Sequence, residues 1–129
     1  MDSLTTARSC AELASDKKSL DLIILELKGN CSLADYFIIC SGTSERHVRA
    51  IAEHLELEMK KKGKRALGIE GLQQGRWVLL DFDTVIIHVF HEEERDFYDL
   101  EGLWMDCPRI AVHDDGSSVK AADADTESP

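Results

Sequence analysis

The sequence lacks three features that would place the chain in a membrane, in a secretion pathway or around a metal ion. No stretch approaches the ~20 consecutive apolar residues that a membrane-spanning helix needs. Residues Met1 to Arg8 have neither the basic start nor the apolar run of a secretion signal. The 4 cysteines include no CxxC pair, so their spacing offers neither a zinc knuckle nor a redox motif. These absences predict a cytoplasmic protein with reduced, structural thiols at Cys10, Cys31, Cys40 and Cys107.

Positive charge is also scarce, since 15 basic residues stand against 25 acidic ones and the formal net charge is −10. A chain this acidic repels phosphate, which argues against direct recognition of free nucleic acid. Residues 112–129 contain five acids and one base, a net −4, so residues 1–111 carry the remaining −6. The folded part is therefore itself acidic, and its best partner is a basic protein surface.

The length of 129 residues suits one compact domain. Residues 112–129 have few large apolar side chains and cannot bury enough surface to offset the entropy lost on ordering. We therefore predict a domain over residues 1–111 and a disordered acidic tail over 112–129.

Helical and strand-like periods alternate along that domain. They predict an α/β (α+β) fold with a mixed five-stranded sheet flanked by about three helices. Ser44 is the expected N-cap of the second helix, and Gly63 the expected residue just after its end. The third helix should carry Phe97, Leu100 and Trp104 on one side. The expected helices are 3–16, 45–62 and 92–104, and the expected strands are 20–27, 35–40, 65–69, 76–81 and 84–90.

The last two expected strands are apolar on both faces. Val78, Leu80, Val85, Ile87 and Val89 define one face. The alternate positions are Trp77, Leu79, Ile86, His88 and Phe90, also mostly apolar. Two interpretations stay open: the helices cover both faces, or part of the second face is a binding patch.

One pattern suggests an enzyme. Asp81-Phe82-Asp83 resembles the DxD pair that holds magnesium in nucleotidyltransferases, and Gly42-Thr43 precedes a helix as their Gly-Ser turn does. Thr43 replaces the serine, however, and Asp81 follows ~40 residues later, farther than that superfamily allows. If Phe82-Asp83 is a hairpin turn, an aspartate there has an ordinary structural use in bonding its own backbone.

The histidines and the basic run have simpler interpretations. None of the histidines lies in a pattern with a nucleophile, and His88 and His91 should point to opposite sides of their strand. The run from Lys60 to Arg65 is typical of a solvated helix end, although it could also touch phosphate.

Aromatic residues gather in the last third of the chain, among many carboxylates. Large anchors ringed by acids are what a protein needs in order to grip a basic partner. An apolar face of this kind could alternatively pair with its own copy, as in a homodimeric scaffold. The aromatic residues are Trp77, Phe90, Phe97, Tyr98 and Trp104.

Three ordered blocks of sequence resemble the ribosomal silencing factor family, also called Iojap-related. They are ADYFIICSGTSERHVRAIAE (34–53), GIEGLQQGRWVLLDFDTVIIHVF (68–90) and RDFYDLEGLW (95–104), and the resemblance covers roughly residues 5–106. It implies a nucleotidyltransferase-like fold without the catalytic groups, and hence no enzyme activity, metal or cofactor. The chain looks like a bacterial member, because no organelle presequence is evident.

The resemblance also implies a mechanism. Such proteins bind the basic ribosomal protein fourteen on the large ribosomal subunit, stop the small subunit from joining, and so repress translation. The family's matching surface would map onto Glu70, Gly71, Trp77, His88, Phe90, Tyr98, Leu100 and Trp104, with Asp81 and Arg95 nearby.

Overall fold

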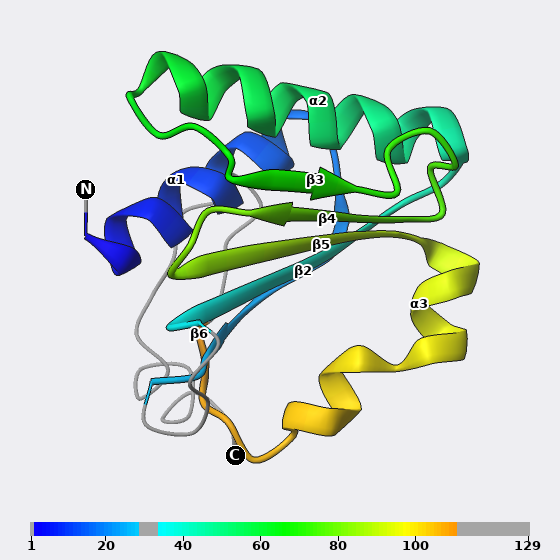
Figure 1. Cartoon of the computed structure of the whole chain (residues 1–129). Helices are drawn as coiled ribbons and strands as arrows, with labels where there is room; N and C mark the ends of the chain where they lie inside the picture. Colours follow the sequence, from blue (N-terminus) through cyan, green and yellow to red (C-terminus); the bar gives the residue numbers. More distant parts are fainter. Residues whose placement is uncertain (1, 29–33, 111–129) are drawn as a thin grey trace.

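The computed structural model describes residues 2–28 and 34–110 (Figure 1). The acidic tail predicted for 112–129 and the thiol of Cys31 therefore lie outside the described residues. In chain order the elements are α1 (Ser3–Asp16), β1 (Leu20–Glu26), β2 (Tyr36–Gly42), α2 (Glu45–Lys61), β3 (Gly68–Glu70), β4 (Trp77–Asp81), β5 (Val85–His91), α3 (Glu92–Tyr98), the 3-10 helix η1 (Leu100–Trp104) and β6 (Arg109–Ile110).

The strands form one mixed sheet in the order β3-β4-β5-β2-β1-β6. β2 and β5 pair in parallel, and every other pair in the sheet is antiparallel. The predicted α/β class with a mixed sheet is confirmed, but the count of five strands is wrong. The sixth strand, β6, pairs with Ile24 and Leu25 of β1. Two residues are too few to show any alternation, so hydrophobic period could not reveal this strand.

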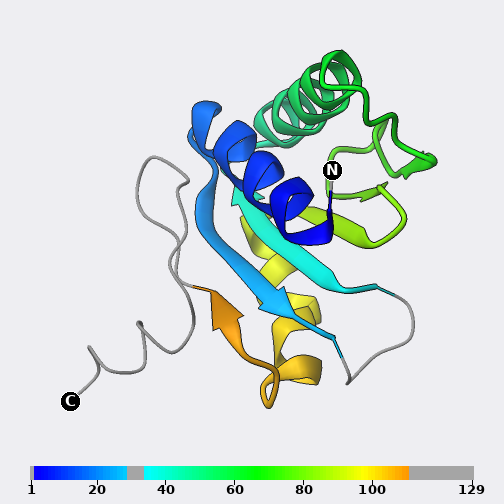
Figure 2. The same ribbon diagram turned by 90° about the vertical axis from the view of Figure 1, so that its left-hand side faces the viewer.

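Helices α1 and α2 lie together on one face of the sheet (Figure 2). The apolar stripe of α2, with Val48, Ile51 and Leu55, packs there against side chains of the central strands such as Leu80 and Ile87. Ser44 caps α2 as predicted, because its hydroxyl accepts a hydrogen bond from the main-chain N–H of His47 at 3.0 Å.

The other face of the sheet is partly covered by α3 and η1, which follow β5 directly (Figure 1). Asp99 has a left-handed backbone, with φ +45°, and separates the two short helices. The single helix predicted over 92–104 is therefore wrong. The break also changes which side chains face inward: Leu100 and Trp104 pack on the sheet, whereas Phe97 is 79% exposed.

Three of the cysteines lie inside the described fold, and all three are free and buried. Burial raises the pKa of both Cys10 and Cys40 to about 12, which keeps their thiols protonated and unreactive. The prediction of structural thiols is confirmed for Cys10, Cys40 and Cys107. Within residues 2–28 and 34–110, none of the helices combines the length and the apolar character of a membrane span.

Candidate functional site

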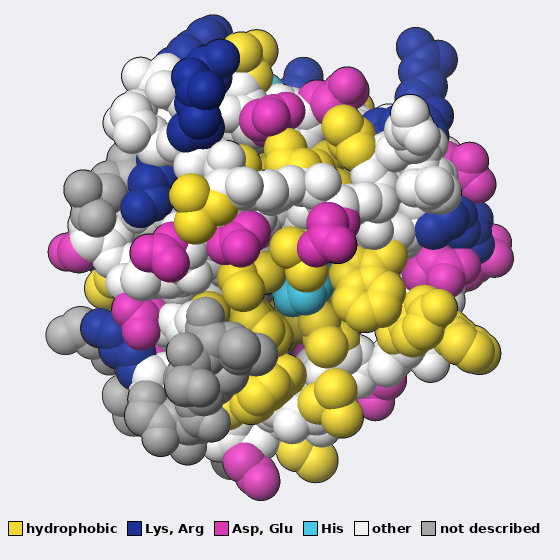
Figure 3. Space-filling view, viewed as in Figure 1, with side chains coloured by type: hydrophobic (Ala, Val, Ile, Leu, Met, Phe, Trp, Pro, Cys, Tyr) yellow, Lys and Arg dark blue, Asp and Glu magenta, His cyan; other side chains and the backbone are white. Residues whose placement is uncertain are grey.

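The second face of the sheet is only partly covered, and an apolar area reaches the surface there (Figure 3). We call it the aromatic face. Its central residue is His88 on β5, and the strand register places Leu79 of β4 directly beside it. A surface of this kind, bordered by charged groups, is typical of a protein-binding site. The aromatic face consists of Trp77, Leu79, Ile86, His88, Tyr98, Leu100 and Trp104.

Trp77 joins the sheet to the helical segment. Its ring lies 4.8 Å from that of Phe90 and 5.0 Å from that of Tyr98, measured between centroids. Its indole N–H donates to Nδ1 of His88 at 3.1 Å. Trp77 is half-buried, while Tyr98 remains 49% exposed. The two rings therefore form a supported platform with one side open to a partner.

Beside Trp77 lies a pocket of about 280 Å³, lined by Glu70, Gly71, Trp77 and Leu79. Glu70 reaches it from the edge strand β3, because Glu70 and Leu79 are register partners on β3 and β4. Gly71 has φ +82°, and a Cβ at this position would collide with the carbonyl oxygen of Trp77. Only glycine allows the chain to turn this closely past Trp77.

The segment that carries Tyr98, Leu100 and Trp104 is strongly acidic. Residues 92–106, which we call the acidic arm, contain seven acids and one base, a net −6. This equals the whole net charge of residues 1–111, so the rest of the domain is neutral in sum. Carboxylates of the arm also line a hollow of about 460 Å³ next to it. The aromatic face is thus bordered by the negative pole of the domain.

The single base of the acidic arm, Arg95, anchors it to the sheet. Its Nε donates to Glu101 at 3.1 Å, and one terminal nitrogen donates to Oγ of Ser41 at 3.1 Å and to the carbonyl oxygen of Leu20 at 3.4 Å. Arg95 is only 8% exposed. It thereby connects α3 with η1, β1 and β2, and holds the arm in place at the border of the aromatic face.

A sequence model of one protein family, described as "Ribosomal silencing factor during starvation", matches residues 1–129 of the chain. The chain belongs to this family. Ribosomal silencing factor RsfS of Halalkalibacterium halodurans is 44% identical over 75% of this chain and 83% of its own length. RsfS of Bacillus subtilis is 38% identical, covering 84% of this chain and 92% of its own length.

A crystal structure supports the same assignment. Protein CV0518 from Chromobacterium violaceum has a TM-score of 0.79 and 35% identity, covering 81% of this chain and 87% of the other. The family resemblance expected from the three sequence blocks is confirmed, and this member of the ribosomal silencing factor family has the fold of its solved relatives.

The residues expected at the family's surface lie at three depths. Glu70, Gly71, Trp77, Tyr98, Leu100 and Trp104 line the aromatic face or its pocket. Phe90 has no exposed surface and lies beneath Trp77, while His88 is 5% exposed at the centre of the face. Arg95 is buried where the acidic arm meets the sheet. Any contribution of Phe90 or Arg95 to binding would act through the exposed side chains they support.

Asp81 lies apart from the other candidate residues. It points to the same side of the sheet as Trp77, but from the far end of β4, about 13 Å along the strand. Its carboxylate accepts a hydrogen bond from the main-chain N–H of Asp83 at 2.8 Å, and Asp83 has φ +72°. The predicted β4–β5 hairpin is confirmed, but its turn lies at Asp83 and Thr84 rather than at Phe82 and Asp83. Phe82 is buried, and its main-chain N–H donates to the carbonyl oxygen of Val85 at 2.9 Å. The part of the chain that is described contains no group of three or more metal-ligating side chains.

Four apolar residues at or near the site of this ribosomal silencing factor are absent from the set that the family resemblance implied. Leu79 and Ile86 belong to the aromatic face by strand alternation, a signal that was available in the sequence. Leu103 and Met105 are 76% and 74% exposed on the arm. Their exposure follows from the break between α3 and η1 at Asp99. The spacing of apolar residues in the sequence does not predict this break.

Proposed function

We propose that the chain binds the large ribosomal subunit through the basic ribosomal protein fourteen, and that its bulk there prevents the small subunit from joining. The observation that carries this proposal is the half-open aromatic face bordered by the acidic arm. Apolar anchors supply affinity, and the surrounding carboxylates favour a positively charged partner and speed encounter with it. Membership of the ribosomal silencing factor family supports the choice of the ribosome as target.

The proposed mechanism needs only obstruction. A standard protein interface buries roughly 800 Å² on each partner. In this proposal the aromatic face and the acidic arm form the interface on this chain. A folded domain held there would overlap any contact that the small subunit must make. The chain then represses translation as a cytoplasmic binding protein, without turnover or cofactor.

A gradient profile of purified ribosomal subunits tests this proposal. We expect the joined-ribosome peak to fall when the protein is added before mixing, with both subunits intact and the protein migrating with the large subunit. A Trp77→Ala variant is the negative control, since it keeps the charge but removes an anchor. Unchanged joining at saturating protein would contradict the proposal.

The pocket beside Trp77 allows a sharper electrostatic test. Glu70 is exposed and has no ion-pair partner among the described residues, while Trp77 and Leu79 provide an apolar wall. A lysine or arginine of the partner could lay its stem along this wall and its charge against Glu70. We expect Glu70→Lys to weaken docking about tenfold at low salt, and less at high salt, because the local attraction becomes repulsion.

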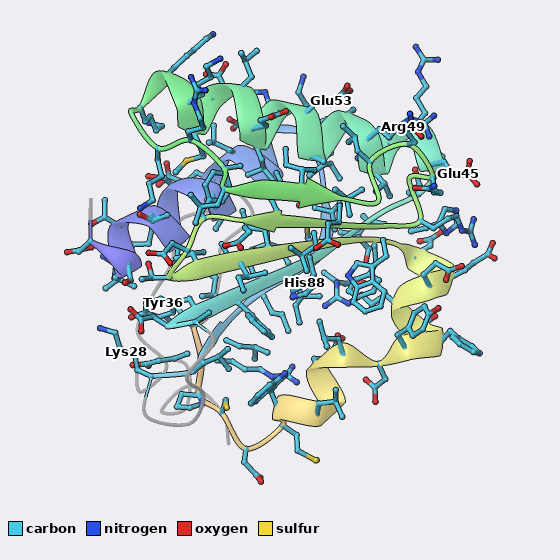
Figure 4. The ribbon with its side chains drawn as sticks, viewed as in Figure 1. Lys28, Tyr36, Glu45, Arg49, Glu53 and His88 are labelled. Carbon is cyan, nitrogen blue, oxygen red and sulfur yellow. The ribbon has the colours of Figure 1, made fainter. Side chains whose placement is uncertain are left out.

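Glu53→Lys is the matched control for this variant. It changes the net charge equally, but Glu53 is exposed on α2, which covers the opposite face of the sheet (Figure 4). Equilibrium binding to large subunits at two salt concentrations separates local from overall charge. If both variants lose the same affinity, the pocket plays no part in docking.

A further inference from the structure

His88 is a polar side chain in the middle of an apolar surface. It lies on the central strand β5 with Ile86 and Phe90 as same-face neighbours, and with Leu79 and Ile39 beside it on the adjoining strands. Its ring reaches the molecular surface at the centre of the aromatic face (Figures 3 and 4). No charged or titratable side chain is among these neighbours.

The hydrogen bond from Trp77 fixes the state of this ring. An indole N–H can only donate, so Nδ1 of His88 must be the acceptor of the 3.1 Å bond. The proton of the neutral ring is then on Nε2. Burial lowers the pKa of His88 to about 4, so the ring stays neutral at neutral pH.

Nε2 is left without a partner. It is buried, and it makes no hydrogen bond among the described residues. Folded proteins pair the large majority of their buried polar atoms, so an exception at an exposed face calls for a partner from outside. Because Nε2 carries the proton of the neutral ring, its partner must be a hydrogen-bond acceptor.

Resting on the proposed function, we propose that Nε2–H of His88 donates a hydrogen bond to an uncharged oxygen of the docked ribosomal protein, such as a main-chain carbonyl. A carboxylate of the partner would be repelled by the acidic arm, whose net charge is −6. A lysine or arginine cannot bond to Nε2, because both groups are donors. The centre of the aromatic face thus favours a hydrogen-bond acceptor of the partner, while the acidic arm at its border favours cationic side chains of the partner.

Because Nε2 is buried in the free protein, a docked partner must move the side chains around it. The residues beside His88 on β4 and β5, Leu79 and Ile86, are half-buried. Side chains at the surface change rotamer within picoseconds to nanoseconds, far faster than a protein complex forms. A docked chain that displaces these two side chains slightly can bring a carbonyl oxygen to the edge of the ring.

Two variants of similar shape test the donor. His88→Gln keeps an amide N–H near the position of Nε2, whereas His88→Met fills the site with a side chain that cannot donate. We expect His88→Gln to bind large subunits about tenfold more tightly than His88→Met, the size of one satisfied hydrogen bond in a desolvated site. Thermal unfolding of the two free variants is measured in parallel.

The expected ranking is opposite to that of a role in packing alone. The bond that His88 accepts from Trp77 also favours glutamine over methionine, so the two variants are compared again in a Trp77→Phe background, which lacks that donor. Methionine suits an apolar site better than glutamine, so a packing role would make His88→Met the more stable and the tighter binder. Equal binding by the two variants, or tighter binding by His88→Met, would overturn the inference. Failure of the proposed interface itself is seen separately, as undiminished docking of Trp77→Ala and Tyr98→Ala.

Discussion

Trp77→Ala is expected to weaken docking on the large ribosomal subunit by about 2 kcal/mol or more, which is roughly a thirtyfold rise in Kd. The indole is half-buried, packs on both Phe90 and Tyr98, and forms a wall of the pocket beside Glu70. Its removal takes away one of the two tryptophans of the aromatic face. It also leaves the Tyr98 ring without support on that side, so two contacts are lost together.

Two further variants make this result specific. Trp77→Phe keeps an aromatic ring but removes the N–H that bonds His88, and should give an intermediate loss. Leu57→Ala removes a 53% exposed leucine from α2 and should leave docking unchanged. Co-sedimentation over a range of subunit concentrations gives the Kd of each variant. Wild-type affinity for Trp77→Ala, with its fold intact, would show that the partner binds elsewhere.

Arg95→Met is expected to lower the free energy of unfolding by about 3 kcal/mol, because it leaves the buried side of Glu101 without its cation. Arg95 and Glu101 have side chains that are 9% and 20% exposed, and the same guanidinium also binds Ser41 and the carbonyl oxygen of Leu20. For a domain of this size the melting temperature should fall by roughly 10 °C. Docking should weaken as well, since the acidic arm carries Tyr98, Leu100 and Trp104.

A double-mutant cycle separates the ion pair from simple packing at this position. Combining Arg95→Met with Glu101→Leu removes both charges, and should recover part of the stability that Arg95→Met loses. Arg95→Lys keeps a charge but not the planar fork that reaches three partners, and should be intermediate. A melting temperature of Arg95→Met equal to that of the wild type would contradict an anchoring role.

Much of the fold was predictable because period, capping and turn chemistry agree along the chain. The stripe of α2, its Ser44 cap and the β4–β5 hairpin all follow from local signals. The signals that failed are those without a local period. β6 is a two-residue strand held by pairing with β1, and the break at Asp99 depends on a left-handed residue that is not glycine. Tertiary contacts decide both.

The sequence predicted which residues belong to the candidate site, but not how deeply each of them is buried. Trp77 and Phe90 are register partners on the same face, and strand alternation treats them alike. Phe90 lies on the central strand and is fully covered, while Trp77 lies on the strand next to the sheet's edge and stays half-open. Their difference comes from strand order and from the position of the arm, which no local pattern encodes.

The two outermost strands of the described sheet are very short, with 3 residues in β3 and 2 in β6. Short edge strands are poor templates for strand-by-strand stacking of copies, although β6 pairs with β1 only at Ile24 and Leu25. The aromatic face offers two copies another way to associate, by contact between their faces. The same surface would then serve both the dimer and the ribosome. An excess of free large subunits would bind single copies and shift the equilibrium from dimer to monomer by mass action.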